Sequence, residues 1–229
     1  MEERTRAEVI AQALRKAIIE QALEPGAKLP EDVVGDTFGV SRTVARRALE
    51  LLAAEELVEF RPRRGAAVSR PTLAEGRDLF AVRIDLERVV VRRLTGRLEE
   101  DQLATLARMV EHEHHAHHHG RPEYIRLAAE FHVVLGEMTG SLVLSRLLAQ
   151  LVWRSALVLR LYGRPRWDSC NLQEHLDLIE ALRASDAAAA EALMTTHLES
   201  VLLRGLDGGK AGGAEEPGDI LRRYARADS

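Results

Sequence analysis

The spacing of hydrophobic positions predicts a chain built almost entirely from helices. From about residue 4 to residue 21, apolar side chains recur at helical spacing, and Pro25-Gly26 then marks a turn. A second, short helix is expected to start with Pro30 as its first helical residue and to stop at Gly39. The pattern therefore places two helices and a turn ahead of the next amphipathic segment.

The segment from Val40 to Leu52 divides most clearly into a polar and an apolar face. At roughly 100° per residue, its apolar side chains fall on one arc and its polar side chains on the other. The polar arc contains Arg42, Thr43, Arg46, Arg47 and Glu50. Ser41 precedes this helix and suits an N-cap position. A capped helix that packs one face and presents guanidinium groups from its first turns is typical of DNA recognition.

Two short strands are expected directly after this helix, at residues 57–60 and 66–68. They flank the basic loop Arg-Pro-Arg-Arg-Gly, in which Arg64 and Gly65 are candidates for a wing that touches DNA phosphates. The alternative is an ordinary solvated loop. Its place immediately after a helix-turn-helix favours the wing.

The second half of the chain contains helical segments joined by short connections. Pro71-Thr72 marks the boundary, and Thr72 with Glu75 has the spacing of a capping box. Five helical segments follow the first one, at about 99–118, 122–138, 141–162, 171–184 and 186–204. No alternating strand pattern interrupts them, so an antiparallel helical bundle is expected.

The expected fold is therefore mainly α, with an N-terminal winged helix-turn-helix, a small β-hairpin wing and a C-terminal antiparallel all-helical bundle. We expect a DNA-binding domain at residues 1–70, a helical domain at 71–204 and a flexible glycine-rich tail at 205–229.

Charge and composition limit the function. The net charge is −4 and the pI about 6.2, so DNA contact must come from a local basic patch. Cys170 is the single cysteine, which excludes an intrachain disulfide framework. The N-terminus has no apolar signal region, and no run of eighteen apolar residues occurs. A cytoplasmic protein without a membrane span is expected.

The nine histidines fall into two groups. Six form a dense run near a predicted helix end: His112, His114, His115, His117, His118 and His119. This run either takes up transition metals weakly or is an exposed polar helix end. The other three, His132, His175 and His197, lie on three different predicted helices. Three inward imidazoles can form a metal site with an open position, although each histidine taken alone is more often a satisfied core histidine than a ligand.

The N-terminal segment resembles the winged helix-turn-helix domain of the GntR family of bacterial transcription regulators. The resemblance is carried by PGAKLPEDVVGDTFGVSRTVARRALELLAAEELVEFRPRRGAAV within residues 6–70. It implies a homodimer that binds a double-stranded DNA operator. The chain departs from the family pattern at Val44-Ala45, at Arg47, where an acidic residue is common, and at Glu56, where glycine is common. The candidate DNA contacts are Ser41, Arg42, Thr43, Arg46, Arg47, Arg64 and Gly65.

Residues 76–204 are similar to the all-helical effector-binding domain of the FadR-type subfamily, the FCD domain. The matching pieces are LFAVRIDLE, EFHVVLGEMTG, EHLDLIEAL and AEALMTTHLE. The resemblance implies a divalent metal, zinc or nickel, held by His132, His175 and His197. The family's aspartate is replaced by Ala128, and Glu130 is poorly placed to substitute for it. Either an oxygen from water or an effector completes the metal shell, or the histidines line a metal-free anion pocket.

The resemblance also implies a ligand role for Arg83 in the first helix of this domain, and Arg154 and Arg160 are expected near the same cavity. A guanidinium grips a carboxylate with two hydrogen bonds, so a small carboxylate effector is expected. The alternative for Arg83 is an i,i+4 ion pair with Glu87 on a solvated face.

Together these features indicate a ligand-responsive bacterial transcription regulator, expected to be a repressor and not an enzyme. One alternative is a metal sensor, in which the ion itself is the signal. A second is a metal-dependent hydrolase or lyase, but no nucleophile or base accompanies the histidines in the sequence.

Overall fold

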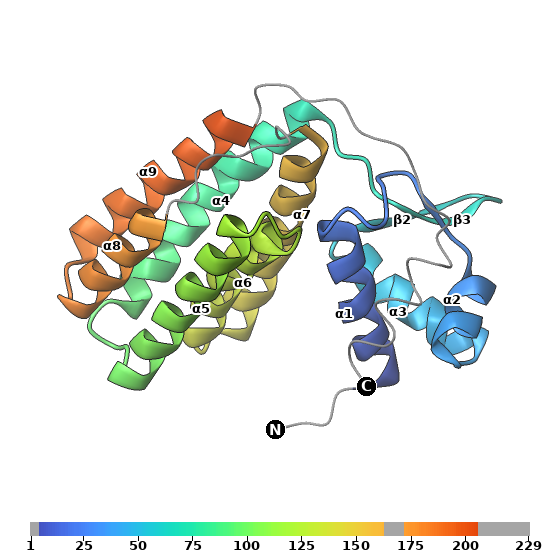
Figure 1. Cartoon of the computed structure of the whole chain (residues 1–229), viewed down its shortest axis with the longest axis horizontal. Helices are drawn as coiled ribbons and strands as arrows, with labels where there is room; N and C mark the ends of the chain where they lie inside the picture. The colour runs from blue at the N-terminus through green and yellow to red at the C-terminus, as the bar shows by residue number, and fades with distance from the viewer. Residues whose placement is uncertain (1–4, 163–171, 206–229) are drawn as a thin grey trace. The chain divides into compact units, whose positions relative to one another are not determined.

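The computed structural model describes residues 5–162 and 172–205 (Figure 1). The chain divides into two compact units, with the boundary between Pro71 and Thr72. The N-terminal unit contains α1 (Arg6–Ile19), β1 (Lys28–Leu29), α2 (Glu31–Phe38), α3 (Arg42–Ala54), β2 (Val58–Arg61) and β3 (Gly65–Val68). Cys170 and the expected tail beyond residue 205 lie outside the described residues.

The core of the N-terminal unit forms where α1 packs against α3. Leu14 and Ile18 of α1 and Leu49 and Leu52 of α3 are fully buried. Burial of such a leucine side chain stabilises the fold by about 2 kcal/mol, so this stripe anchors α3. The opposite face of α3 is thereby left in solvent, as the amphipathic pattern predicts.

Two predicted helix starts are confirmed by the structure, and a third differs from it. The Ser41 hydroxyl accepts a hydrogen bond from the Val44 N–H at 3.4 Å, and Thr72 with Glu75 forms the predicted capping box. Pro30 was expected as a first helical residue, and this is wrong. It is the N-cap of α2, with φ −62° and ψ 134°, because its extended ψ continues the direction of the preceding strand.

The small sheet has the order β1-β3-β2, and all its pairs are antiparallel. The predicted hairpin is confirmed as β2 and β3, in which Val58 pairs with Val68 and Arg61 with Gly65. The first strand was not predicted, since two residues are too short for a periodic signal. It is defined only by its pairing with β3, where Lys28 lies opposite Ala67.

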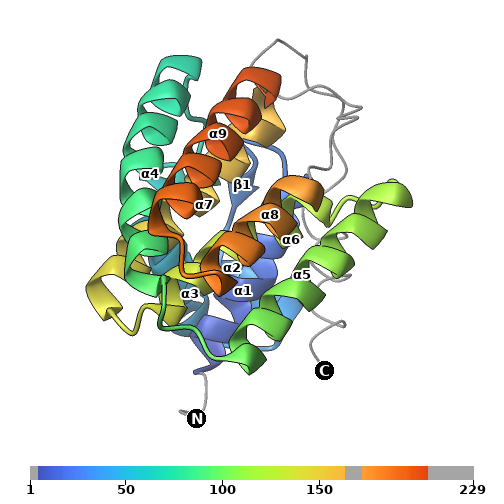
Figure 2. The ribbon, with the colours of Figure 1, turned by 90° about the vertical axis from the view of Figure 1, so that its left-hand side faces the viewer.

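The C-terminal unit is a helical bundle, as predicted. Its helices are α4 (Leu73–Leu94), α5 (Glu100–His118), α6 (Tyr124–Met138), α7 (Leu142–Tyr162), α8 (Leu172–Arg183) and α9 (Ala187–Gly205). In Figures 1 and 2, α4 lies beside α9, and α8 lies between α5 and α9. Both α4 and α6 also pack on α7.

Helix α7 is long and apolar enough to cross a membrane by length and composition alone, which is weak evidence for a span. Half of its most apolar stretch is buried inside the protein. Two glycines bring neighbouring helices close to it. A Cβ on Gly136 of α6 would lie 2.9 Å from Leu148, and one on Gly76 of α4 would lie 2.6 Å from Val158. Close packing within the bundle accounts for the apolar residues on the buried face of α7, whereas Leu142, Val143 and Leu147 are exposed.

Candidate functional site

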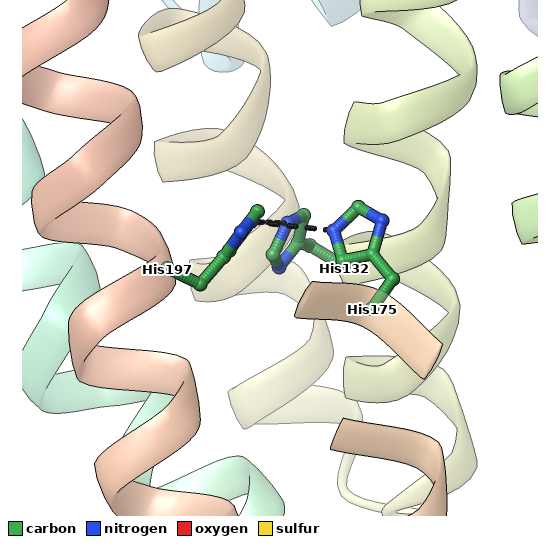
Figure 3. Close-up of side chains that lie close together, drawn as sticks. All are labelled: His132, His175 and His197. Atoms are coloured by element: carbon green, nitrogen blue, oxygen red, sulfur yellow. Dashed lines mark hydrogen bonds between the residues drawn. The ribbon is translucent and has the colours of Figure 1, made fainter. Parts of the chain in front are cut away.

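Three imidazoles from three helices meet inside the bundle (Figure 3). His132 of α6, His175 of α8 and His197 of α9 are 2 %, 2 % and 6 % exposed. The Nε2 atom of His197 lies 3.2 Å from Nε2 of His175 and 3.3 Å from Nε2 of His132. Their candidate ligand atoms all lie within 4.8 Å of one another. The structure thus brings together the three histidines singled out by the sequence.

Aromatic packing contributes to the position of one of these rings. Phe131, fully buried on α6, stacks on His175 with centroids 4.3 Å apart and an angle of 29° between the rings. Because Phe131 directly precedes His132, the same turn of α6 supplies one imidazole and the wall against which another is packed.

Each imidazole is also tied to a carboxylate through its second nitrogen. The Nδ1 atom of His132 lies 2.5 Å from Glu87, that of His175 lies 3.0 Å from Glu113, and that of His197 lies 2.6 Å from Glu174. Glu87 and Glu113 are buried, whereas the side chain of Glu174 is 28 % exposed. We call this set the carboxylate ring.

This hydrogen bonding assigns the proton of each neutral imidazole. A carboxylate accepts the Nδ1–H, so the lone pair of each ring resides on Nε2. Three lone pairs directed at one point repel each other unless a cation lies between them. The donor set suits a divalent metal that prefers imidazole, such as zinc or nickel, and leaves coordination positions open.

The pKa values favour this arrangement at neutral pH. Burial lowers the pKa of His132 to about 4, although the charge of Glu87 opposes the shift. Burial and the charge of His175 lower the pKa of His197 to about 3. For Glu87, burial alone would raise the pKa, but the electrostatic and hydrogen-bond interactions with His132 and Arg83 more than offset it and lower the pKa to about 2. A neutral imidazole therefore donates to an anionic carboxylate.

Arg83 extends this network by one residue. Its Nε donates to Glu87 at 2.6 Å, and the two side chains are 5 % and 0 % exposed. The i,i+4 pair is the one expected from the sequence, but the expected solvated face is wrong. Arg83 and Glu87 lie on the stripe of α4 that also buries Phe80 and Val90, so the pair is enclosed by the bundle. A continuous series runs from Arg83 through Glu87 to His132.

The position of the family's aspartate contributes no ligand. Ala128 lies one helical turn before His132 on α6, and its methyl group has no donor atom. Glu130 accepts a hydrogen bond from Arg126 of the same helix at 2.7 Å, consistent with its expected orientation away from the histidines.

The other two expected effector residues have partners of their own. Arg160 donates to the carbonyl of Pro122 at 2.6 Å and lies over the ring of Tyr124. Hydrogen bonds from Thr72 lower the pKa of Glu75, and the nearby charge of Arg154 adds to this effect. Their role toward an effector stays a prediction.

Sequence reasoning missed the carboxylate ring. One signal was present: Glu87 falls on the apolar stripe of its helix, and a buried charge requires a partner. Glu113 and Glu174 carried no comparable signal, because one lies within a polar histidine run and the other next to His175 in a short helix.

The second candidate site is the exposed face of α3. The side chains of Arg42, Arg46 and Arg47 are 78 %, 59 % and 63 % exposed, and Ser41 and Thr43 are exposed beside them. The structure therefore gathers the five candidate DNA contacts of this segment on one solvent-facing surface.

Two carboxylates hold these guanidinium groups. Glu31, at the start of α2, accepts from Nε of Arg42 at 2.6 Å and from Arg46 at 3.4 Å. Glu50 accepts from Arg46 at 3.1 Å and from Arg47 at 3.5 Å. Neither carboxylate was predicted to contact the recognition arginines. The turn between α2 and α3 brings Glu31 to them, whereas the contacts of Glu50 are i,i+4 and i,i+3 pairs within α3.

The hairpin tip lies next in the chain. Arg64 and Gly65 are exposed, and Gly65 has a φ of +74° that favours glycine at this turn. Phe60 of β2 is 39 % exposed and lies under the guanidinium of Arg46, 5.8 Å from its ring centroid. This contact connects the wing hairpin with the exposed face of α3.

In a comparison with known proteins, each of the two units matches a family model. Residues 6–68 match the family described as bacterial regulatory proteins, gntR family, and residues 78–200 match the FCD domain. The chain is 29 % identical over 202 residues to the HTH-type transcriptional repressor RspR of Escherichia coli, covering 84 % of this chain and 85 % of that protein. It is 27 % identical over 188 residues to the HTH-type transcriptional regulator YdhC of Bacillus subtilis, covering 80 % and 84 %.

A solved structure supports the fold. The structure of E. coli McbR/YncC matches with a TM-score of 0.76 at 20 % identity, over 88 % of this chain and 98 % of that one. At this identity the likeness concerns the fold alone.

Proposed function

This chain belongs to the GntR family of bacterial regulatory proteins and carries an FCD domain, and from this membership we propose that it is a ligand-responsive transcription repressor. Its DNA affinity is controlled by a small organic acid bound at the histidine site. The hydrolase or lyase alternative is set aside, because the family and the relatives are transcription regulators. The name of the relative RspR supports repression over activation.

The exposed face of α3 supports the DNA-binding half of the proposal. In a homodimer, two copies of this face enter successive major grooves of an operator with two-fold symmetry. Arg42, Arg46 and Arg47 contact bases or phosphates, and Ser41 and Thr43 contact phosphates. Arg64 and Gly65 place the wing against the backbone. A DNA operator also implies a cytoplasmic location.

The convergence of three Nε2 atoms is the observation that carries the sensing half. His132, His175 and His197 hold a divalent metal, zinc or nickel, and the carboxylate ring keeps each ring proton on Nδ1. When bound, such a metal supplies a Lewis-acidic centre that binds a carboxylate oxygen. The three imidazoles are neutral, so they leave the charge of the ion available to an anion.

Ala128 supports an acidic effector. The family's aspartate would fill a coordination position that the alanine leaves to an exogenous oxygen. A carboxylate satisfies that position, and Arg83, Arg154 and Arg160 are the candidate guanidinium partners for the rest of the molecule. The effector alters DNA binding because it binds one arrangement of the dimer more tightly than the other.

Metal analysis followed by DNA binding tests the sensing half. The untagged protein is assayed for bound metal and for stabilisation by small carboxylates, with and without added zinc. We expect bound metal in the wild type. His175→Ala should lose the tightly bound metal and the stabilisation by carboxylates, whereas His118→Ala, which changes an exposed histidine outside the trio, behaves as the wild type. Unchanged metal content in His175→Ala would remove the site assignment. DNA binding that responds to metal alone, without any acid, would favour the metal sensor.

The DNA-binding half is tested with a duplex selected in vitro on the wild-type protein. Arg46→Ala should abolish selective binding to this duplex while the circular dichroism and dimerisation stay unchanged. Arg108→Ala, an exposed arginine of α5, is the matched control. Equal affinity of Arg46→Ala and wild type would contradict the proposal.

A further inference from the structure

The histidine run at the end of α5 supplies no imidazole to the buried trio, although Glu113 within the run accepts a hydrogen bond from His175. It places six imidazoles within eight positions: His112, His114, His115, His117, His118 and His119. Of these, His115 and His119 are exposed and one helical turn apart. Their ring centroids lie 4.2 Å apart at an angle of 37°. Neither side chain is used by the proposed function.

The helical hydrogen-bond pattern of α5 includes both His115 and His119. The N–H of His119 bonds to the carbonyl of His115 at 3.3 Å, and Gly120, with φ +61°, then ends the helix. Nδ1 of His119 lies 2.7 Å from the same carbonyl. A carbonyl only accepts, so the proton of neutral His119 is on Nδ1 and its lone pair is on Nε2.

The neighbouring i,i+4 pair is arranged differently. His114 and His118 meet edge to face, at 85° with centroids 4.3 Å apart. His114 is half-buried, and its Nδ1 is a buried atom without a hydrogen-bond partner among the residues that the structure describes. Of the two pairs, His115 and His119 are thus better placed to chelate.

We propose that His115 and His119 form a second, surface site for a divalent transition-metal ion, with water completing the coordination. Two imidazoles at i and i+4 on one helix face are a recognised metal-binding spacing. The helix holds both residues one turn apart on the same face, so the second ligand binds at a high effective concentration. The site also lies at the C-terminus of a 19-residue helix, where the helix dipole favours a cation.

Copper(II) and nickel(II) test this site on the untagged, chelator-treated full chain. Substoichiometric copper(II) should broaden the amide NMR signals of residues near His115 and His119, and His119→Ala should lose this broadening while any broadening around His132 and His197 stays. In a nickel(II) titration, His119→Ala should weaken one class of binding by roughly tenfold or more, because the chelate is lost. His118→Ala is the matched control, since it removes another exposed histidine, from the adjacent pair.

Two results would overturn the proposal. One is copper(II) broadening confined to the surroundings of the buried trio. The other is nickel(II) binding by His119→Ala that equals that of the wild type. Because His119 lies outside the trio, the comparison of wild type with His119→Ala decides the surface site whether or not the buried site holds a metal.

Discussion

Glu87 accepts a hydrogen bond from Nδ1 of His132 at 2.5 Å, and both side chains are withdrawn from solvent. The carboxylate also accepts from Arg83, so a fixed charge on α4 orients an imidazole on α6. This relationship connects the first helix of the bundle with the histidine site, although the two residues are 45 positions apart in the chain.

Replacing Glu87 by glutamine should weaken metal binding by about 10- to 100-fold, because the imidazole loses its charged acceptor. The affinity is measured by competition with a chromophoric chelator. Glu174→Gln, at a partly exposed position, should act in the same direction through His197 and serves if Glu87→Gln fails to fold. Glu111→Gln, an exposed residue of α5, is the control. Wild-type affinity in both folded variants would show that the carboxylate ring does not position the histidines.

Replacing Glu31 by glutamine should reduce the selectivity of DNA binding. The substitution removes the charge that holds Arg42 and Arg46, and it makes the α3 face more cationic. Affinity for random-sequence DNA is expected to rise a few-fold, while the ratio of selected to random affinity falls. The measurement is a pair of salt-dependent titrations with the two duplexes.

Asp36→Asn makes the same change of charge at an exposed position of the same helix. It should leave the affinity ratio near that of the wild type. If both variants change the ratio equally, then Glu31 acts only through net charge and does not position the arginines.

Replacing Glu56 by glycine should stabilise the N-terminal unit. Glu56 has a φ of +56°, in the left-handed region that L-residues adopt at a cost, and the family commonly has glycine here. The free energy of unfolding is expected to rise by up to about 1 kcal/mol, since part of the relieved strain is offset by the flexibility of glycine when unfolded. Thermal unfolding measures this gain. Glu56→Ala keeps the strain and should not increase stability; a gain equal to that of glycine would refute the backbone explanation.

The metal-free protein should lose stability as the pH falls from about 7 to 4. His132 and His197 have pKa values of about 4 and 3 when folded, below the ordinary 6.5, so the unfolded chain binds more protons in this window. Protonation therefore favours unfolding, by at most about 1.4 kcal/mol per pH unit for each histidine. The depressed pKa of Glu87, about 2, extends the loss below pH 4.5 in the same direction.

Urea unfolding of chelator-treated protein at several pH values measures this dependence. His197→Gln should reduce the slope between pH 6.5 and 4, because one titrating group is removed. A midpoint that does not change over this range in the wild type would contradict the expected burial of neutral histidines.

The local features of this protein were determined by its sequence. The amphipathic pattern from Val40 to Leu52 placed the recognition helix and its exposed arginines, and Ser41 with Thr72 placed two helix starts, because capping and helical periodicity depend on neighbouring residues only. The same periodicity marked His132, His175 and His197 as members of three helices. The hairpin was also predictable, because its two strands are close in the chain and flank a turn sequence.

The tertiary structure decided which of these groups meet. The sequence could not pair Glu87 with His132, Glu113 with His175 or Glu174 with His197, because each pair joins two helices whose relative rotation follows from the packing of the whole bundle. In the N-terminal unit, the turn between α2 and α3 likewise brings Glu31 to Arg42. Strand β1 exists only through its partner strand. Hydrogen bonds between residues far apart in the chain depend on how the helices pack, and a local sequence pattern contains no information about that packing.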